Sequence, residues 1–339
     1  MSSMVKHLIS ASILIIPFST AVAAQQSDGI VWQRGTGDSA AASPTAQKPQ
    51  APAVQYDPSE GQVPAALQRW KMLSASGNFS FGEYASFLMR YPDWPNSDEM
   101  RKNAEQAINP LSLSPSQVVA FFDRLPPLTN AGRARFAIAL HASGDTSRAE
   151  EQARAAWRGG ALNDDDEARM FRIAGKHFTS ADHDARVDRL LWSGSTRGAE
   201  RWIAYTSPQR RPAFVAALAT RLKAADADQK VQDAGSLANS EASLIAARAD
   251  SMRSSGNSIG ARELLANRAN LAAPVPVLKD WYQLLLTHAQ AAANDGQYDL
   301  AYRIASRVDD ATPRGVAMVD QDIATRDRYT SLTWLAGMT

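Results

Sequence analysis

A short motif between two helical stretches matches the nucleophile elbow of serine hydrolases. Gly256-Asn257-Ser258-Ile259-Gly260 has the G-x-S-x-G spacing, in which a sharp turn from a strand into a helix exposes the serine hydroxyl for attack. Here the residues before the motif, Leu244 to Arg253, follow a helical pattern instead. Because no strand precedes the serine, we interpret the motif as the turn of a helical hairpin.

Two histidines and their acidic neighbours have the residue types of a metal site. They are His177 and His183, with Asp182 and Asp184 beside the second. A zinc-binding helix places its histidines four residues apart on one face, whereas a separation of six places them on different sides. We therefore interpret this segment as a polar loop with a capping aspartate. The acidic run Asp164 to Glu167 is interpreted as the first turn of a helix rather than a calcium site, because carboxylates there complement the helix dipole.

Other patterns that could indicate chemistry are weaker. Gly35-Thr36-Gly37 with Ala40 loosely matches a dinucleotide fingerprint, but no strand precedes it and no helix follows. A glycosidase needs a carboxylic acid with a raised pKa in a groove, and no carboxylate has the apolar, glycine-containing context that would single it out. Trp157, Trp202 and Trp281 fall at apolar helical positions and predict a core rather than a sugar platform. The sequence therefore nominates no catalytic, cofactor-binding or metal-ligating residue.

These residues are positioned by helices that meet at glycines. In the stretch Asp250 to Asn270, one helix ends at Ser254-Ser255, Gly256 makes the turn, and a new helix carries Ala261. Glycine suits the left-handed conformation that closes a helix, and a small residue five positions later lets two backbones approach closely. The same step of five recurs at Gly144/Ala149, Gly194/Ala199 and Gly296/Ala301, and in weaker form at Gly77/Gly82.

The apolar periodicity predicts an all-α fold. From Ala65 onward, apolar residues recur at i, i+3, i+4 and i+7, and the alternation typical of strands is absent. Tetratricopeptide repeats recur every 34 residues or so, whereas the turn glycines here are unequally spaced. We therefore expect a degenerate TPR-like helical-hairpin solenoid or superhelix. Its first helices are predicted at Ala65–Ser74, Phe81–Arg90, Ser97–Ile108 and Pro115–Phe122.

The composition is that of a folded protein with balanced charge. Of 339 residues, 45% are hydrophobic and 21% charged, and 36 basic residues face 35 acidic ones, for a net charge of +1. That balance argues against nucleic acid as a partner. Eight of the 36 basic residues are lysine, and the excess of arginine is consistent with bidentate salt bridges across helix faces. The absence of cysteine excludes disulfides and thiolate chemistry.

The N-terminus has the pattern of a secretory signal peptide. Lys6 and His7 precede an apolar run, Leu8 to Phe18, and small residues follow. The run is too short for a transmembrane anchor, which takes roughly 20 residues, and the absence of cysteine excludes a lipoprotein. We predict a signal peptide at 1–24, cleaved near Ala23 or Ala24, and a periplasmic location. Residues 25–64, rich in Ala, Pro, Ser and Gln, are predicted to be a disordered lead-in to a helical domain at 65–339.

Several segments in the helical part resemble the amino-terminal region of soluble lytic murein transglycosylases. The resemblance covers about Pro64 to the end of the chain, and the order and spacing of its segments are more specific than any one of them. The segments are Phe87–Pro95, Ala161–Phe171, Arg186–Gly194, Ala246–Asn257 and Leu332–Gly337.

The resemblance implies a periplasmic helical superhelix that curls into a ring. In that family a carboxyl-terminal lysozyme-like domain uses one glutamate to cleave peptidoglycan between N-acetylmuramic acid and N-acetylglucosamine, leaving a 1,6-anhydro product. The family's Glu-Ser dipeptide and its Gly-Leu-Met-Gln motif do not occur here, so no catalytic residue is carried over. We expect the helical scaffold of such an enzyme, truncated at its C-terminus and inactive alone, with peptidoglycan glycan strands as partner. The alternative is an exported TPR-like protein that binds other proteins.

Overall fold

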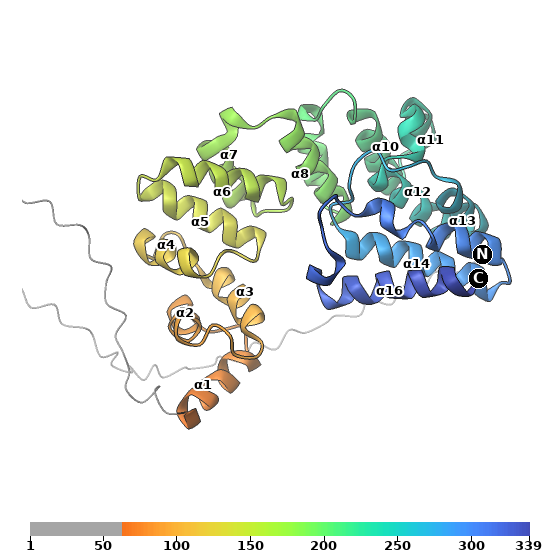
Figure 1. The fold of residues 1–339 in the computed structure, drawn as a ribbon. Coiled ribbons are helices and arrows are strands. Elements are labelled where there is room, and N and C mark those ends of the chain that lie inside the picture. Colours follow the sequence, from red (N-terminus) through yellow and green to blue (C-terminus); the bar gives the residue numbers. More distant parts are fainter. Residues whose placement is uncertain (1–62) are drawn as a thin grey trace, which may run out of the picture. The chain divides into compact units, whose positions relative to one another are not determined.

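Helices make up all the regular structure in the part of the chain that the computed structural model describes, residues 63–339. These residues belong to one compact unit, and Figure 1 follows them from α1 to α16. The α-helices are α1 (Val63–Ala75), α2 (Phe81–Arg90), α3 (Ser97–Ala107), α4 (Pro115–Arg124), α5 (Asn130–Ala142), α6 (Thr146–Arg158), α7 (Asp164–Ala174), α8 (Ser180–Trp192), α9 (Thr196–Trp202), α10 (Arg211–Arg221), α11 (Ala227–Asp233), α12 (Ala242–Ser254), α13 (Ser258–Asn267), α14 (Leu278–Asn294), α15 (Tyr298–Ala305) and α16 (Ile323–Met338). Short 3-10 helices are η2 (Gly175–His177), η3 (Ile203–Tyr205), η4 (Gly235–Asn239), η5 (Val308–Ala311) and η6 (Met318–Asp320).

The all-α class predicted from the apolar periodicity is confirmed for residues 63–339. Helix α2 begins and ends at the predicted residues, Phe81 and Arg90. Helix α1 begins at Val63, so the last two residues of the expected lead-in are helical. Pro64 fits there because a first-turn N–H has no acceptor within the helix. The expected signal peptide and the rest of the lead-in lie outside the described residues.

The predicted turn glycines close helices in the left-handed conformation. The φ angles of Gly144, Gly194, Gly256 and Gly296 are 84°, 73°, 86° and 73°, values that favour glycine because it has no Cβ. Gly77, where the sequence signal is weaker, is not among the glycines with positive φ. The predicted hairpin turns are therefore confirmed at four of these five glycines.

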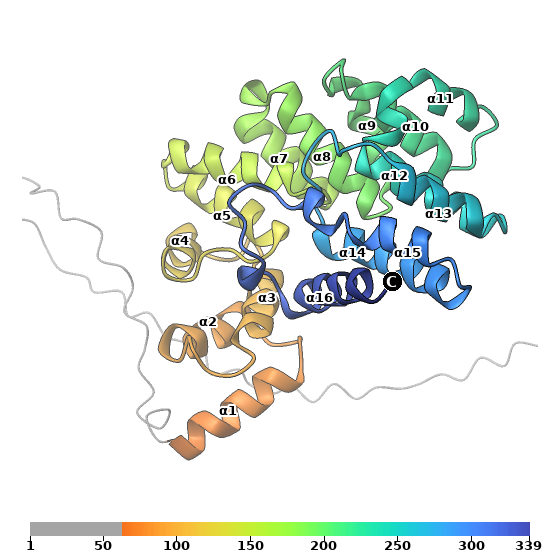
Figure 2. The same cartoon turned by 45° about the vertical axis from the view of Figure 1, so that its right-hand side comes forward.

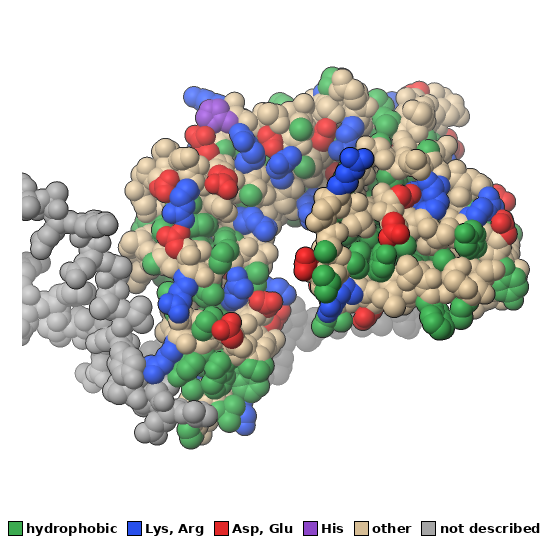
Figure 3. Space-filling model, viewed as in Figure 1, with side chains coloured by type: hydrophobic (Ala, Val, Ile, Leu, Met, Phe, Trp, Pro, Cys, Tyr) green, Lys and Arg blue, Asp and Glu red, His purple; other side chains and the backbone are tan. Residues whose placement is uncertain are grey.

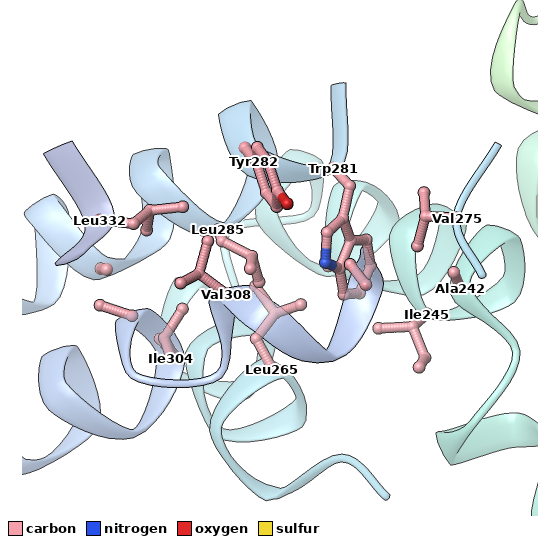
Figure 4. Close-up of a cluster of buried hydrophobic side chains, with 14 of the residues drawn as sticks. Ala242, Ile245, Leu265, Val275, Trp281, Tyr282, Leu285, Ile304, Val308 and Leu332 are labelled. Carbon is pink, nitrogen blue, oxygen red and sulfur yellow. The ribbon is translucent and has the colours of Figure 1, made fainter. Parts of the chain in front are cut away.

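Four groups of buried apolar side chains follow one another along the chain. The first joins α1 to α6, the second α5 to α7, the third α8 to α12, and the fourth α12 to α16. In the fourth group, Trp281 and Leu285 of α14 lie among Ile245 of α12, Leu265 of α13 and Ile304 of α15 (Figure 4). The core is thus divided into segments that are mostly local in sequence.

Helix contacts show the same local order. Helix α5 contacts α6 and α7, α6 contacts α8, α10 contacts α12, and α14 contacts α15 and α16. The last three lie side by side in both Figure 1 and Figure 2. None of the helices in residues 63–339 has both the length and the apolar character needed to cross a lipid bilayer.

Candidate functional site

A cavity of about 820 Å³ lies between α5, α6, α8 and the segment that precedes α14. Four arginines line it, and we call it the arginine cavity: Arg133 from α5, Arg158 from α6, Arg189 from α8, and Arg210. Ala273, Pro274 and Pro276 face them from the segment before α14. Figure 3 shows basic and acidic side chains mixed over α5 to α8.

Guanidinium groups outnumber carboxylates in the arginine cavity. Its two acidic residues are Asp184 and Asp188. The Asp184 carboxylate is already engaged, because Ser207 donates to it from its backbone nitrogen at 2.8 Å and from its hydroxyl at 2.6 Å. Arg158 lies 3.3 Å from the buried carboxylate of Asp182. Arg133 and Arg189, by contrast, form no side-chain hydrogen bond or ion pair within residues 63–339, so these two guanidinium groups are available to an anionic ligand such as a carboxylate.

One of the lining guanidinium groups, that of Arg210, joins three helices. Arg210, at the start of α10, donates to both carboxylate oxygens of Glu241, at 3.0 Å from Nε and 2.6 Å from Nη2. Glu241 precedes α12, and Nη2 of Arg210 also donates to Asp188 of α8 at 3.3 Å. Both acidic residues are buried. This bidentate pairing across helices is the arrangement that the arginine-rich composition favoured.

Asp188 and Glu241 share one cation, the guanidinium of Arg210, in the interior of the protein. Burial raises the pKa of Asp188 to about 7, and the negative charge of Glu241 adds to the rise, while Arg210 partly opposes it. Close to neutral pH, the Asp188 carboxyl group therefore exchanges a proton. Its Oδ2 faces Arg210 and the residue is 4% exposed, so in this arrangement it orients that guanidinium.

A second region combines a buried ion pair with aromatic rings. Glu167 of α7 accepts hydrogen bonds from Arg201 at 2.8 Å and from Trp202 at 3.1 Å, and its other oxygen pairs with the buried Arg186. The partners of Glu167 thus come from the later helices α8 and α9, and they fix it in place. Rings pack around this pair in a continuous cluster, made of Trp157, Phe171, Phe178, His183, Trp202 and Tyr205. The prediction that Trp157 belongs to the core is confirmed.

The structure separates the two histidines suggested by the sequence. His177 lies in η2 and contacts Glu150 at 2.9 Å, whereas His183 lies on α8 and packs against Trp157. Thr179 is the N-cap of α8, and Asp182, the third residue of the helix, completes a capping box through reciprocal hydrogen bonds with it, so the expected aspartate takes part in the cap without being the cap residue. The expectation of a polar loop is wrong, since most of this segment is the first turn of α8. Among the described residues, no group of three or more His, Asp or Glu side chains is placed to hold a metal ion.

Two other sequence motifs occupy helix ends. Asp164 to Glu167 form the first turn of α7, as predicted, with Asn163 as its cap. Ser258 of the G-x-S-x-G motif is the first residue of α13, after a helix and a glycine turn, and Asn257 caps that helix through a 2.9 Å hydrogen bond from the nitrogen of Gly260. The interpretation of the motif as a hairpin turn is confirmed.

Sequence reasoning did not identify the arginine cavity. Its arginines belong to separate helices, and no short motif connects them. The excess of arginine over lysine was the available signal, but it does not indicate which arginines come together in the fold.

No protein-family model, curated protein or solved structure matches the chain.

Proposed function

We propose that residues 63–339 are the helical scaffold part of a periplasmic peptidoglycan lytic transglycosylase, and that the arginine cavity holds peptide-substituted glycan strands. The observation that carries this proposal is a cavity of about 820 Å³ lined by four guanidinium groups. The peptides attached to peptidoglycan bear carboxylates, and guanidinium groups bind carboxylates through paired, charge-assisted hydrogen bonds.

The arrangement of the helices supports a scaffold. Glycine-turned helix pairs that contact mainly their neighbours are typical of a TPR-like solenoid, and such arrays offer extended concave binding surfaces. The segment Arg186–Gly194, one of those that resemble the lytic transglycosylases, supplies Asp188 and Arg189 to the cavity. The ligand site and the family resemblance therefore meet on α8.

The test is cosedimentation of the purified protein with peptidoglycan sacculi. We expect the wild-type protein to sediment with them, and the triple variant Arg133→Ala/Arg158→Ala/Arg189→Ala to bind at least about tenfold more weakly, since each hydrogen bond to a charged group contributes about 1.5–3 kcal/mol. Arg210 is left in place because it joins α8, α10 and α12.

A matched triple variant controls for the loss of three positive charges. Arg172→Ala/Arg197→Ala/Arg314→Ala removes three exposed arginines that do not line the arginine cavity. It should sediment as the wild type does. Failure of the wild-type protein to sediment with sacculi, or equal weakening by both triple variants, would reject the proposal and favour the alternative of a protein-binding repeat.

A further inference from the structure

A second cavity, of about 280 Å³, lies between α8, α10, α12 and α14. We call it the balanced cavity, because two arginines and two aspartates line it and their charges cancel. Its polar wall includes Trp192, Arg221, Asp250, Arg253, Asp280 and His288. A further cavity of about 270 Å³ adjoins it, because Arg221 and Asp250 line both. Ligand sites for drug-sized molecules measure about 300–1,000 Å³, so the balanced cavity suits one small unit, with room for a second next to it.

Three buried polar atoms of this wall have no hydrogen-bond partner among the described residues. They are Nε1 of Trp192, Nε of Arg221 and Nε2 of His288. His288 is 2% exposed, and burial together with Arg253 lowers its pKa, so its imidazole is neutral at pH 7. An unpaired buried polar atom costs about 1–3 kcal/mol. These three atoms are therefore available to a polar ligand in the cavity.

The charged side chains of the wall act on one another electrostatically, as Asp250 does on Arg221, but without direct contact. Within residues 63–339, no hydrogen bond or ion pair involves the side chain of Arg221, Arg253, Asp250 or Asp280. Two carboxylates and two guanidinium groups leave no net charge. In the arginine cavity, by contrast, the guanidinium groups of Arg133 and Arg189 form no ion pair with a carboxylate among the described residues. The balanced cavity therefore favours a neutral ligand that both donates and accepts hydrogen bonds.

We propose that the balanced cavity binds a neutral N-acetylated saccharide unit. Carboxylates accept hydrogen bonds from sugar hydroxyls, which matches Asp250 and Asp280. The N–H groups of Trp192 and Arg221 need an acceptor, which the carbonyl oxygen of an acetamido group supplies. The inference deepens the proposed function and rests on it in one respect, that the glycan strand would be the source of the saccharide.

The test uses tri-N-acetylchitotriose, which is neutral and carries no peptide, with the full chain in isothermal titration calorimetry. Asp250→Asn and Asp280→Asn should each weaken binding at least about tenfold, because each removes a hydrogen bond to a charged acceptor. Asp228→Asn is the matched control, since Asp228 is exposed and lines neither cavity. Asp280 is also exposed, so its variant should keep the wild-type melting temperature.

The outcomes separate this inference from the proposed function. Absence of trisaccharide binding overturns the inference even when sacculi still sediment the protein. Binding that Asp250→Asn and Asp280→Asn leave unchanged overturns the assignment to this cavity. Trisaccharide binding weakened by these two variants, in a protein that does not sediment with sacculi, supports the cavity and rejects the proposed function.

Discussion

Asp188 and Glu241 place two buried carboxylates on one guanidinium, and this makes the protein's stability depend on pH. In an unfolded chain an aspartate has a pKa of about 3.9, whereas in the folded protein burial and the charge of Glu241 raise that of Asp188 to about 7. Between these values the folded state holds a proton that the unfolded state has lost. The contribution of Asp188 to stability is therefore fully present below about pH 4 and is lost as the pH rises through 7.

Asp188→Asn removes this titration, so its effect on melting temperature should change with pH. The variant carries a neutral group at every pH, and the burial penalty of the charged carboxylate is absent. We expect the melting temperature of the variant minus that of the wild type to become more positive from pH 5 to pH 8. Thermal unfolding followed by circular dichroism measures this difference. The exposed Asp165→Asn serves as control, and a difference for Asp188→Asn that stays constant with pH would contradict the prediction.

The sequence was sufficient to predict contacts between residues that are close in the chain. It was not sufficient to predict contacts between residues that are far apart in the chain. The capping box of α8 joins Thr179 to Asp182, three residues later, so its chemistry is visible in a short window. Asp188, Arg210 and Glu241 come from three elements. Their meeting depends on how α8, α10 and α12 pack, and the periodicity of one helix does not encode that. The balanced cavity was missed for the same reason.

At the scale of the helix, glycine turns explain why the boundaries were predictable. Gly256 has a φ of 86°, and no atom lies within 4 Å of the place where a Cβ atom would stand. Gly82, the second residue of α2, has equally open space and no positive φ. A methyl group therefore meets no clash at either position, and only the backbone conformation differs. Apolar spacing gives the length of a helix, and a glycine of this kind gives its end.

This contrast predicts opposite effects of the same substitution. Gly256→Ala should lower stability by about 1–2 kcal/mol, since alanine is disfavoured in the left-handed conformation. Gly82→Ala should raise it by roughly 0.5–1 kcal/mol, because alanine is the better residue within a helix. Urea unfolding of the two variants measures both changes. Equal effects at the two positions would show that the turn does not require glycine.

Across the whole described unit, the core is a series of groups, and this predicts local rather than global unfolding. Leu285 lies in the group that joins α12 to α16, and Leu88 in the group that joins α1 to α6. Both are fully buried, and truncating a buried leucine to alanine costs about 2–5 kcal/mol. In arrays where each element contacts mainly its neighbours, such a loss remains close to the site of the change.

Native-state hydrogen exchange distinguishes local from global unfolding. Leu285→Ala should reduce the protection of amides in α12 to α16 and leave α2 to α5 protected, whereas Leu88→Ala should do the reverse. Each variant thus serves as the control for the other, since the two change the same kind of side chain at the same degree of burial. If both variants reduce protection evenly across all helices, the described residues unfold as one cooperative unit.

The same measurement tests ligand binding in the arginine cavity, whose wall combines α5, α6 and α8 with the segment before α14. A ligand bound there should raise protection at both ends of the series, because it contacts elements that belong to different groups of the core.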